Sequence, residues 1–204
     1  MKHAVSLALA LACAGCASSR AELEPIARAR IASDYASYEL RRVGVAPFEG
    51  ALAEREHGTA LQAAFAAELA AGVQFEVVPL DLDDLEETAR QDTLRRGRTD
   101  PQAILELARR YRLDGVVVGT VVELSSWPHA RAGIEVDLLA TETGMAIWSA
   151  RVHADAARQS TRDHLERWLE ETRKDHGETE GADVWLLSSR RLVEFAAAQA
   201  AALL

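Results

Sequence analysis

The most constraining feature of this chain is an unbroken apolar, β-branched run at residues 113–123, LDGVVVGTVVE. Valine is stiff about χ1 and packs well on a pleated surface, so the run predicts a β-strand. Because no polar residues alternate within it, we expect a central strand that is covered on both faces. Gly119 leaves one face without a side chain, so we expect a neighbouring backbone or helix to approach closely there.

The residues before this run predict a strand–helix–strand unit. Strands are expected at 40–48 and 75–79, and a helix at 59–71, whose Leu61, Phe65 and Leu69 recur every four residues. Short strands joined by one helix favour a right-handed βαβ unit with parallel strands. A short helix is expected at 84–92, and another begins at Asp100-Pro101, residue types that suit the N-cap and the first helical position.

The residues after the run predict an antiparallel meander and then helices. A short turn at 125–131 leads to an alternating strand at 133–141, and a tight turn at 142–144 leads to a return strand at 145–154. Beyond it we expect a helix capped by Ser160 or Thr161, a charged loop at 174–181, and a last helix capped by Asp183. The alanine-rich end of that last helix permits close packing.

The predicted fold class is therefore α/β (α+β). It has a single mixed β-sheet, in which a βαβ unit is followed by an antiparallel meander, with helices packed on the sheet and a C-terminal helix. A chain of 204 residues suits one domain with appendages. With a net charge of −9 we expect no nucleic-acid partner, because nucleic-acid binding needs a basic face.

The first residues predict an export signal. A positive start is followed by an apolar run at 4–12, too short to span a bilayer. Ala14-Gly15-Cys16 resembles the bacterial lipobox, which implies acylation of Cys16 and a membrane anchor made of acyl chains. Cys13 is the competing lipidation site, and an ordinary cleaved signal is the alternative.

These signals divide the chain into three parts. Residues 1–15 are a lipoprotein signal peptide, residues 16–38 a tether, and residues 39–204 a mixed α/β periplasmic domain. In the enterobacterial sorting rule, an Asp directly after the lipidated cysteine keeps a lipoprotein in the inner membrane. Here the residue after Cys16 is Ala17, so by resemblance to that rule we expect the outer membrane, on its periplasmic face. Ile26, Ile31, Tyr35 and Tyr38 could instead dock part of the tether on the domain, and both alternatives stay open.

Candidate sites in the domain are weak, and we assign no catalytic, cofactor-binding or metal-binding residue. His153 and Asp155 lie on one strand face as a metal-pair candidate, but a solvated strand end is the favoured interpretation. His164 and His176 are about 18 Å apart along a helix, too far to share an ion. The basic run 95–98 is interpreted as a solvated loop.

Two tryptophans are candidate anchors for a partner protein, because tryptophan is frequent at interface centres. For Trp168 we favour a place in the core. For Trp127, in the predicted turn, exposure and burial stay open.

Three motifs, in order, resemble the CsgG/LpoB-like lipoprotein superfamily, which is itself similar to the N-terminal domain of TolB. They are VGVAPF at 43–48, LDGVVVGTV at 113–121 and TGMAIWSA at 143–150, and the resemblance covers about residues 40–155. It implies a mixed α/β sheet in the periplasm, used as an assembly or regulatory surface. Characterised relatives are secretion-channel subunits or activators of penicillin-binding proteins.

The chain departs from this family in two ways. The turn at 125–131 is too short for a membrane-crossing hairpin, which needs strands of about 9–11 residues, so pore formation is disfavoured. The tether has a single proline, Pro25, and so a shorter reach than the long proline-rich tether of LpoB-like activators.

We therefore expect a lipid-anchored periplasmic accessory or regulatory protein that binds another envelope protein, such as a penicillin-binding protein or a secretion component. The alternative is a structural subunit of an envelope secretion or transport complex, formed by self-association. We expect neither enzymatic activity nor a cofactor.

Overall fold

The computed structural model describes residues 24–50, 55–81, 101–176 and 181–204. They form one six-stranded mixed sheet with the order β1-β6-β5-β4-β2-β3. The strands are β1 (Ala27–Ile31), β2 (Arg42–Val45), β3 (Glu76–Pro79), β4 (Gly115–Ser125), β5 (Arg131–Ala140) and β6 (Ala146–Asp155). The helices are α1 (Arg55–Gly72), α3 (Pro101–Tyr111), α4 (Gln159–His176), α5 (Ala182–Leu186) and α6 (Ser189–Ala201), with a 3-10 turn, η1, at Tyr35–Ser37.

The predicted topology is confirmed. Strands β2 and β3 are parallel and joined through α1, and β2 is also parallel to β4. Strands β4, β5 and β6 form the antiparallel meander. The interior position of β4 agrees with its continuous valine run.

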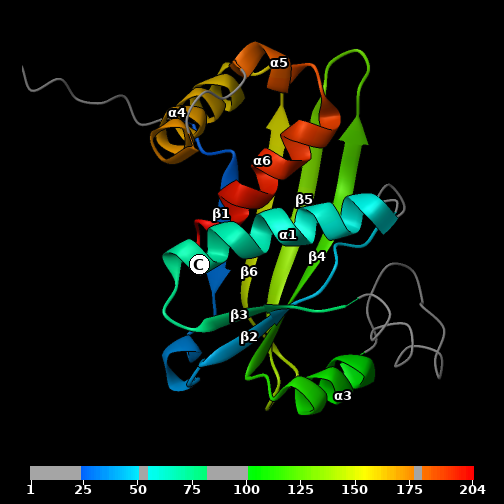
Figure 1. The fold of residues 1–204 in the computed structure, drawn as a ribbon, viewed down its shortest axis with the longest axis vertical. Coiled ribbons are helices and arrows are strands. Elements are labelled where there is room, and N and C mark those ends of the chain that lie inside the picture. The colour runs from blue at the N-terminus through cyan, green and yellow to red at the C-terminus, as the bar shows by residue number, and fades with distance from the viewer. Residues whose placement is uncertain (1–23, 51–54, 82–100, 177–180) are drawn as a thin grey trace, which may run out of the picture.

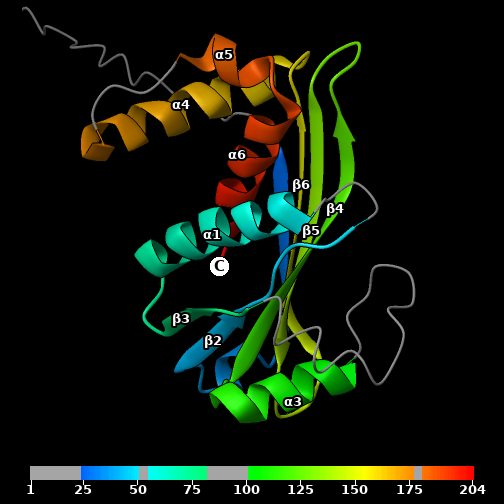
Figure 2. The same cartoon turned by 45° about the vertical axis from the view of Figure 1, so that its right-hand side comes forward.

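The helices are divided unequally between the two faces of the sheet. Helices α1 and α6 cross one face, with α4 and α5 above them on the same side, whereas α3 lies on the other side at the lower end of β4 (Figures 1 and 2). Most buried apolar residues form one core under α1 and α6, and a second, smaller core lies under α3.

The close packing expected of the alanine-rich C-terminal helix is confirmed in α6. Ala196, Ala197 and Ala200 are fully buried, so this helix approaches the sheet through residues with no bulk beyond Cβ. Trp148 on β6 is buried beneath it and donates from Nε1 to the carbonyl of Leu203 at 3.3 Å.

The expectation that β4 is covered on both faces holds only for its first half. Val116 packs under α3 and Val117 under α1 and α6. Val122, near the other end, is 50% exposed. Helix α3 has only 11 residues and covers the start of β4, so none of the described helices lies over the upper part of this sheet face (Figure 2).

Gly119 performs the predicted role, with a different neighbour. A Cβ at this position would lie 2.5–2.7 Å from three ring carbons of Phe48. The group that approaches is therefore an aromatic side chain, not a backbone or a helix. Phe48 is buried between β4 and α1, where its ring lies 5.7 Å from that of Phe65.

The segment predicted as a tether supplies an edge strand. Residues 27–31 pair antiparallel with β6, and Tyr35 and Tyr38 pack against the main core, so the docking alternative describes this part of the chain. Burial raises the pKa of the Tyr35 phenol above its ordinary value.

Several helix boundaries were predicted wrongly. Helix α1 begins at Arg55, before the predicted start at residue 59. Helix α4 begins at Gln159, before Ser160 and Thr161, and extends into the predicted loop at 174–181 as far as His176. The segment predicted as one last helix forms two helices, α5 and α6, because the chain leaves helical geometry at Ser188. The Ser188 side chain caps α6 by accepting a hydrogen bond from the Arg191 backbone N–H. Asp183 lies in the first turn of α5, whose N-cap is Gly181.

Candidate interaction surfaces

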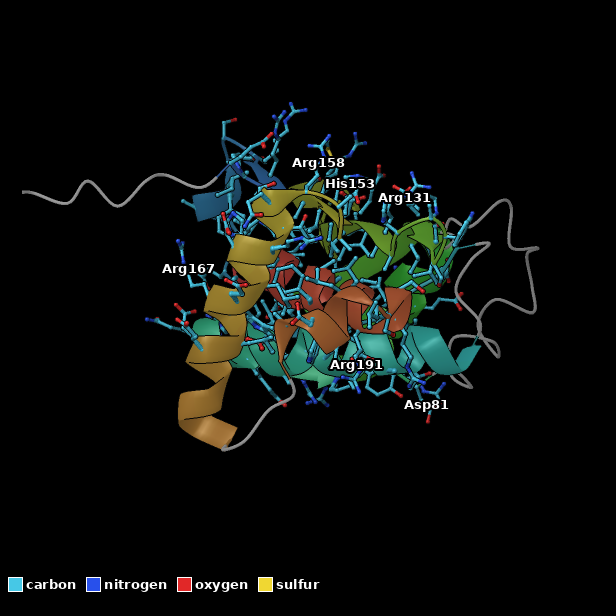
Figure 3. The ribbon with its side chains drawn as sticks, turned by 90° about the horizontal axis from the view of Figure 1, so that it is seen from above. Asp81, Arg131, His153, Arg158, Arg167 and Arg191 are labelled. Atoms are coloured by element: carbon cyan, nitrogen blue, oxygen red, sulfur yellow. The ribbon has the colours of Figure 1, made fainter. Side chains whose placement is uncertain are left out.

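On the side away from α1 and α6, strands β1, β6, β5 and β4 present a surface that no helix of the described residues covers, and we call it the open face. Figure 3 shows Arg131, His153 and Arg158 on this side of the sheet, and Arg191 on the helical side. Its outward side chains come from alternate strand positions, with a register shift between Val121 and Glu123 that turns both Val122 and Glu123 outward. They are Arg28, Arg30, Val122, Glu123, Glu135, Asp137, Ser149, Arg151 and His153. All of them except Glu123 line a shallow depression of about 840 Å³.

Charge on the open face is divided by strand except at Arg131, which lies on β5 and contacts Glu123. Arg28, Arg30 and Arg151 lie on β1 and β6, and we call them the basic half. Glu123, Glu135 and Asp137 lie on β4 and β5, and we call them the acidic half. The register places Arg28 directly opposite Arg151, an arrangement of like charges that is unfavourable in an isolated sheet.

One ion pair joins the two halves across β5 and β6, and two further contacts converge on Glu123. Arg151 Nε lies 3.1 Å from Glu135 Oε1, its partner in the register. His153 Nδ1 lies 3.2 Å from Glu123 Oε2, and the two side chains meet above Gly133, which contributes no side chain between them. Arg131 Nη1 also contacts Glu123, at 3.3 Å.

The predicted metal-pair candidates do not converge. His153 turns toward Glu123, whereas Asp155 Oδ1 accepts from the backbone N–H of Ala157 at 2.9 Å. His164 Nε2 lies 3.2 Å from the carbonyl oxygen of Glu24. Among the residues that the structure describes, no group of three or more His, Cys, Asp or Glu side chains is placed to hold a metal ion.

A second surface lies at the upper end of the molecule, where the β4–β5 hairpin meets α5 and α6 (Figure 1). Trp127 is 83% exposed at the hairpin turn, and Leu187, between α5 and α6, is 84% exposed. The hydroxyls of Ser126 and Ser189 are hydrogen-bonded at 2.9 Å and join the turn to the start of α6. We call this apolar surface, which also includes the half-exposed Val184, the hairpin end.

The two tryptophan candidates are thus separated by the structure. Trp127 is exposed. The core position favoured for Trp168 is confirmed, because its ring packs edge-on to Trp185 at 5.2 Å and against Phe195 at 5.6 Å. Trp168 therefore holds α4 to α5 and α6.

Several predicted sites lie outside the described residues. These are Cys13 and Cys16, the predicted signal peptide, the helix at 84–92 and the basic run 95–98. None of the described helices combines the length and the apolar character needed to cross a membrane.

The sequence analysis missed Arg28 and Arg30 as surface residues. A signal was present, because residues 27–31 read ARARI and alternate with the period of a strand. The run is short and lies in a polar segment, so its pairing with β6 became visible only in three dimensions.

The sequence matches no protein-family model and no curated protein. Among solved structures, the chain is similar to PelC from Paraburkholderia phytofirmans, a dodecamer, with a TM-score of 0.51 and 15% identity over 87% of this chain and 96% of PelC. This similarity establishes a shared fold.

Two weaker structural similarities fall below the level at which a shared fold can be argued. Lipoprotein GNA1162 from Neisseria meningitidis has a TM-score of 0.43 and 16% identity over 67% of this chain and 99% of its own. The LpoB C-terminal domain from Salmonella enterica has a TM-score of 0.38 and 16% identity over 56% and 82%. Membership of the CsgG/LpoB-like superfamily stays a prediction.

Proposed function

We propose that this protein is a lipid-anchored protein of the bacterial outer membrane, on its periplasmic face, that acts by binding another envelope protein and catalyses no reaction. The observation that supports the proposal is the hairpin end. Two large apolar side chains there, Trp127 and Leu187, are more than 80% exposed, and exposed apolar groups that gather at one place mark interaction surfaces.

The hairpin end is also held in place before any partner binds. Ser126 is tied to Ser189, and Ser125 Oγ donates to the carbonyl of Trp127 at 3.0 Å. A preorganised anchor loses less conformational entropy on binding than a mobile one. Tryptophan suits this role because it is among the residues that contribute most binding energy at interface centres.

Site-specific photo-crosslinking tests the proposal. A photoreactive amino acid is placed at Trp127 and, as the control, at the exposed Ala67 on α1, in cells that express the full chain. We expect a discrete protein adduct from position 127 and none from position 67. Equal adducts from both positions, or adducts to lipid alone, would contradict protein binding at the hairpin end.

The anchor is tested separately. Cys16→Ala is expected to abolish incorporation of labelled palmitate and to release the protein from the membrane fraction. If the Cys16→Ala variant still incorporates palmitate, Cys13 is the lipidation site. If the unaltered protein incorporates none, lipidation is contradicted.

A second candidate function is that of a structural subunit formed by self-association. It is favoured by the shared fold with PelC, whose solved structure is a dodecamer. Light scattering of the chain from Ala17 onward, which carries no acyl group, measures its mass over a range of concentrations. A mass that rises above the monomer value supports this candidate, and a monomer at every concentration contradicts it.

A further inference from the structure

The structure points to the open face as the surface through which two copies of this chain bind each other, and we propose that they do so about a two-fold axis parallel to the strands. This inference rests on the self-association candidate. It concerns a different surface from the hairpin end and identifies the occupant of the open face as a second copy.

Charge complementarity indicates this occupant. The basic half lies on β1 and β6, and the acidic half lies on the neighbouring β5 and β4. A two-fold axis that runs parallel to the strands, between β6 and β5, reverses the order of the strands in the second copy relative to the first. Strands β1 and β6 of each copy then lie over β4 and β5 of the other, so the basic half of each copy faces the acidic half of the other. A two-fold axis across the strands would place β1 over β1 and oppose like charges.

The proposed dimer also supplies carboxylate partners for the arginines of the basic half. Arg28 and Arg151 are directly opposite each other, and among the described residues one carboxylate, that of Glu135, forms an ion pair with Arg151. Arg30 lies in register with Ser149, which in turn lies in register with Asp137. Carboxylates from a second copy would stabilise this cluster of guanidinium groups, and the same contact would place guanidinium groups over Glu135 and Asp137.

The two edges of the sheet favour this face over strand addition. Edge strand β1 carries Arg28 and Arg30, and edge strand β3 ends in Pro79. Charged side chains and proline are the features by which edge strands resist pairing with another chain. A second copy therefore meets the face of the sheet, where side chains and not backbone groups make the contacts.

The direction of the proposed two-fold axis is compatible with the anchoring of both copies in one membrane. Residues 24–27 enter the sheet at the end where β1 begins, and a strand-parallel axis puts this end of both copies on the same side. Both predicted anchors then reach one bilayer.

Four strands about 4.8 Å apart and some five residues long give a face of roughly 320 Å² per copy, below the roughly 800 Å² per partner of a stable interface. We therefore expect a weak dimer in solution that becomes stronger where anchoring raises the local concentration.

The test uses two opposite charge variants. In the acidic variant, Arg28→Glu and Arg30→Glu give the open face a net negative charge; in the basic variant, Glu135→Lys and Asp137→Lys give it a net positive charge. Sedimentation equilibrium of the chain from Ala17 onward measures association up to millimolar concentration. Each variant alone is expected to dimerise about tenfold more weakly than the unaltered chain, and an equimolar mixture is expected to form a heterodimer at least as strong as the original homodimer.

The control for the basic variant is Glu166→Lys with Glu170→Lys. It makes the same change of charge at exposed positions of α4 and should leave association unchanged. Unaltered urea midpoints verify folding of every variant. Failure of the mixture to associate overturns the proposed interface. If the unaltered chain still oligomerises in that case, self-association stands and only this face is excluded. Crosslinking at Trp127 is unaffected by either result.

Discussion

The contact between Gly119 and Phe48 makes a quantitative prediction about stability. Gly119→Ala adds one methyl group on the face of β4 that the Phe48 ring covers. The new carbon would lie 2.5, 2.6 and 2.7 Å from three ring carbons, about 1 Å closer than carbon atoms normally approach. The ring cannot swing into solvent without losing its burial, because Phe48 is 3% exposed and Phe65 lies behind it.

The expected magnitude follows from two opposing effects. Overpacking of this kind costs about 1–3 kcal/mol. Replacing glycine by alanine in a strand recovers roughly 0.5–1 kcal/mol, because the unfolded chain loses less freedom on folding. Because all three contacts are shorter than 3.0 Å, we take the overpacking cost from the upper half of its range, about 2–3 kcal/mol, so Gly119→Ala should lower the free energy of unfolding by about 1–2.5 kcal/mol.

Urea denaturation of the chain from Ala17 onward measures this difference. Gly72→Ala is the matched control, since a Cβ there has nothing within 4 Å, and we expect it to be neutral or stabilising. Phe48→Val, which removes all three clashing ring carbons, provides the second arm of a double-mutant cycle. In that background Gly119→Ala should cost nothing. An equal cost in both backgrounds, or a Gly119→Ala variant as stable as the original, would refute the assigned contact.

Three further predictions concern other described residues. The buried Gln62 donates to the carbonyls of Val45 and Leu80, both at 2.7 Å, so Gln62→Leu should cost about 1–3 kcal/mol in urea denaturation. Arg112 has a φ of 53° after α3, so Arg112→Gly should raise stability by roughly 0.5 kcal/mol, and a loss would contradict left-handed strain there. The raised pKa of Tyr35 means that the folded protein keeps this proton to higher pH than the unfolded chain, so stability should fall as pH rises above about 10; urea midpoints of Tyr35→Phe should fall less over that range.

The sheet was predictable where the chain carries its own pattern. Alternation in β5 correctly placed Ile134, Val136 and Leu138 in the core and Glu135 and Asp137 on the other face. The helix ends were predicted wrongly because the residues that end a helix do so only in some structural contexts. Charged residues at 174–176 read as a loop, yet they continue α4.

The candidate surfaces were only partly predictable. Trp127 could be named from the sequence, but its exposure could not, since a tryptophan in a turn folds inward or outward according to what packs around it. The open face could not be predicted, because the basic half combines Arg28 and Arg30 with a residue from the far end of the meander.

The sequence by itself determined strands β2 to β6, the order of the βαβ unit and meander, and the face that these strands turn toward the core. These properties depend on residue spacing within single segments, where backbone geometry fixes the direction of successive side chains. The tertiary structure alone decided which part of the second sheet face remains uncovered. That outcome depends on the short reach of α3 and on the docking of β1, both set by contacts between residues far apart in the chain.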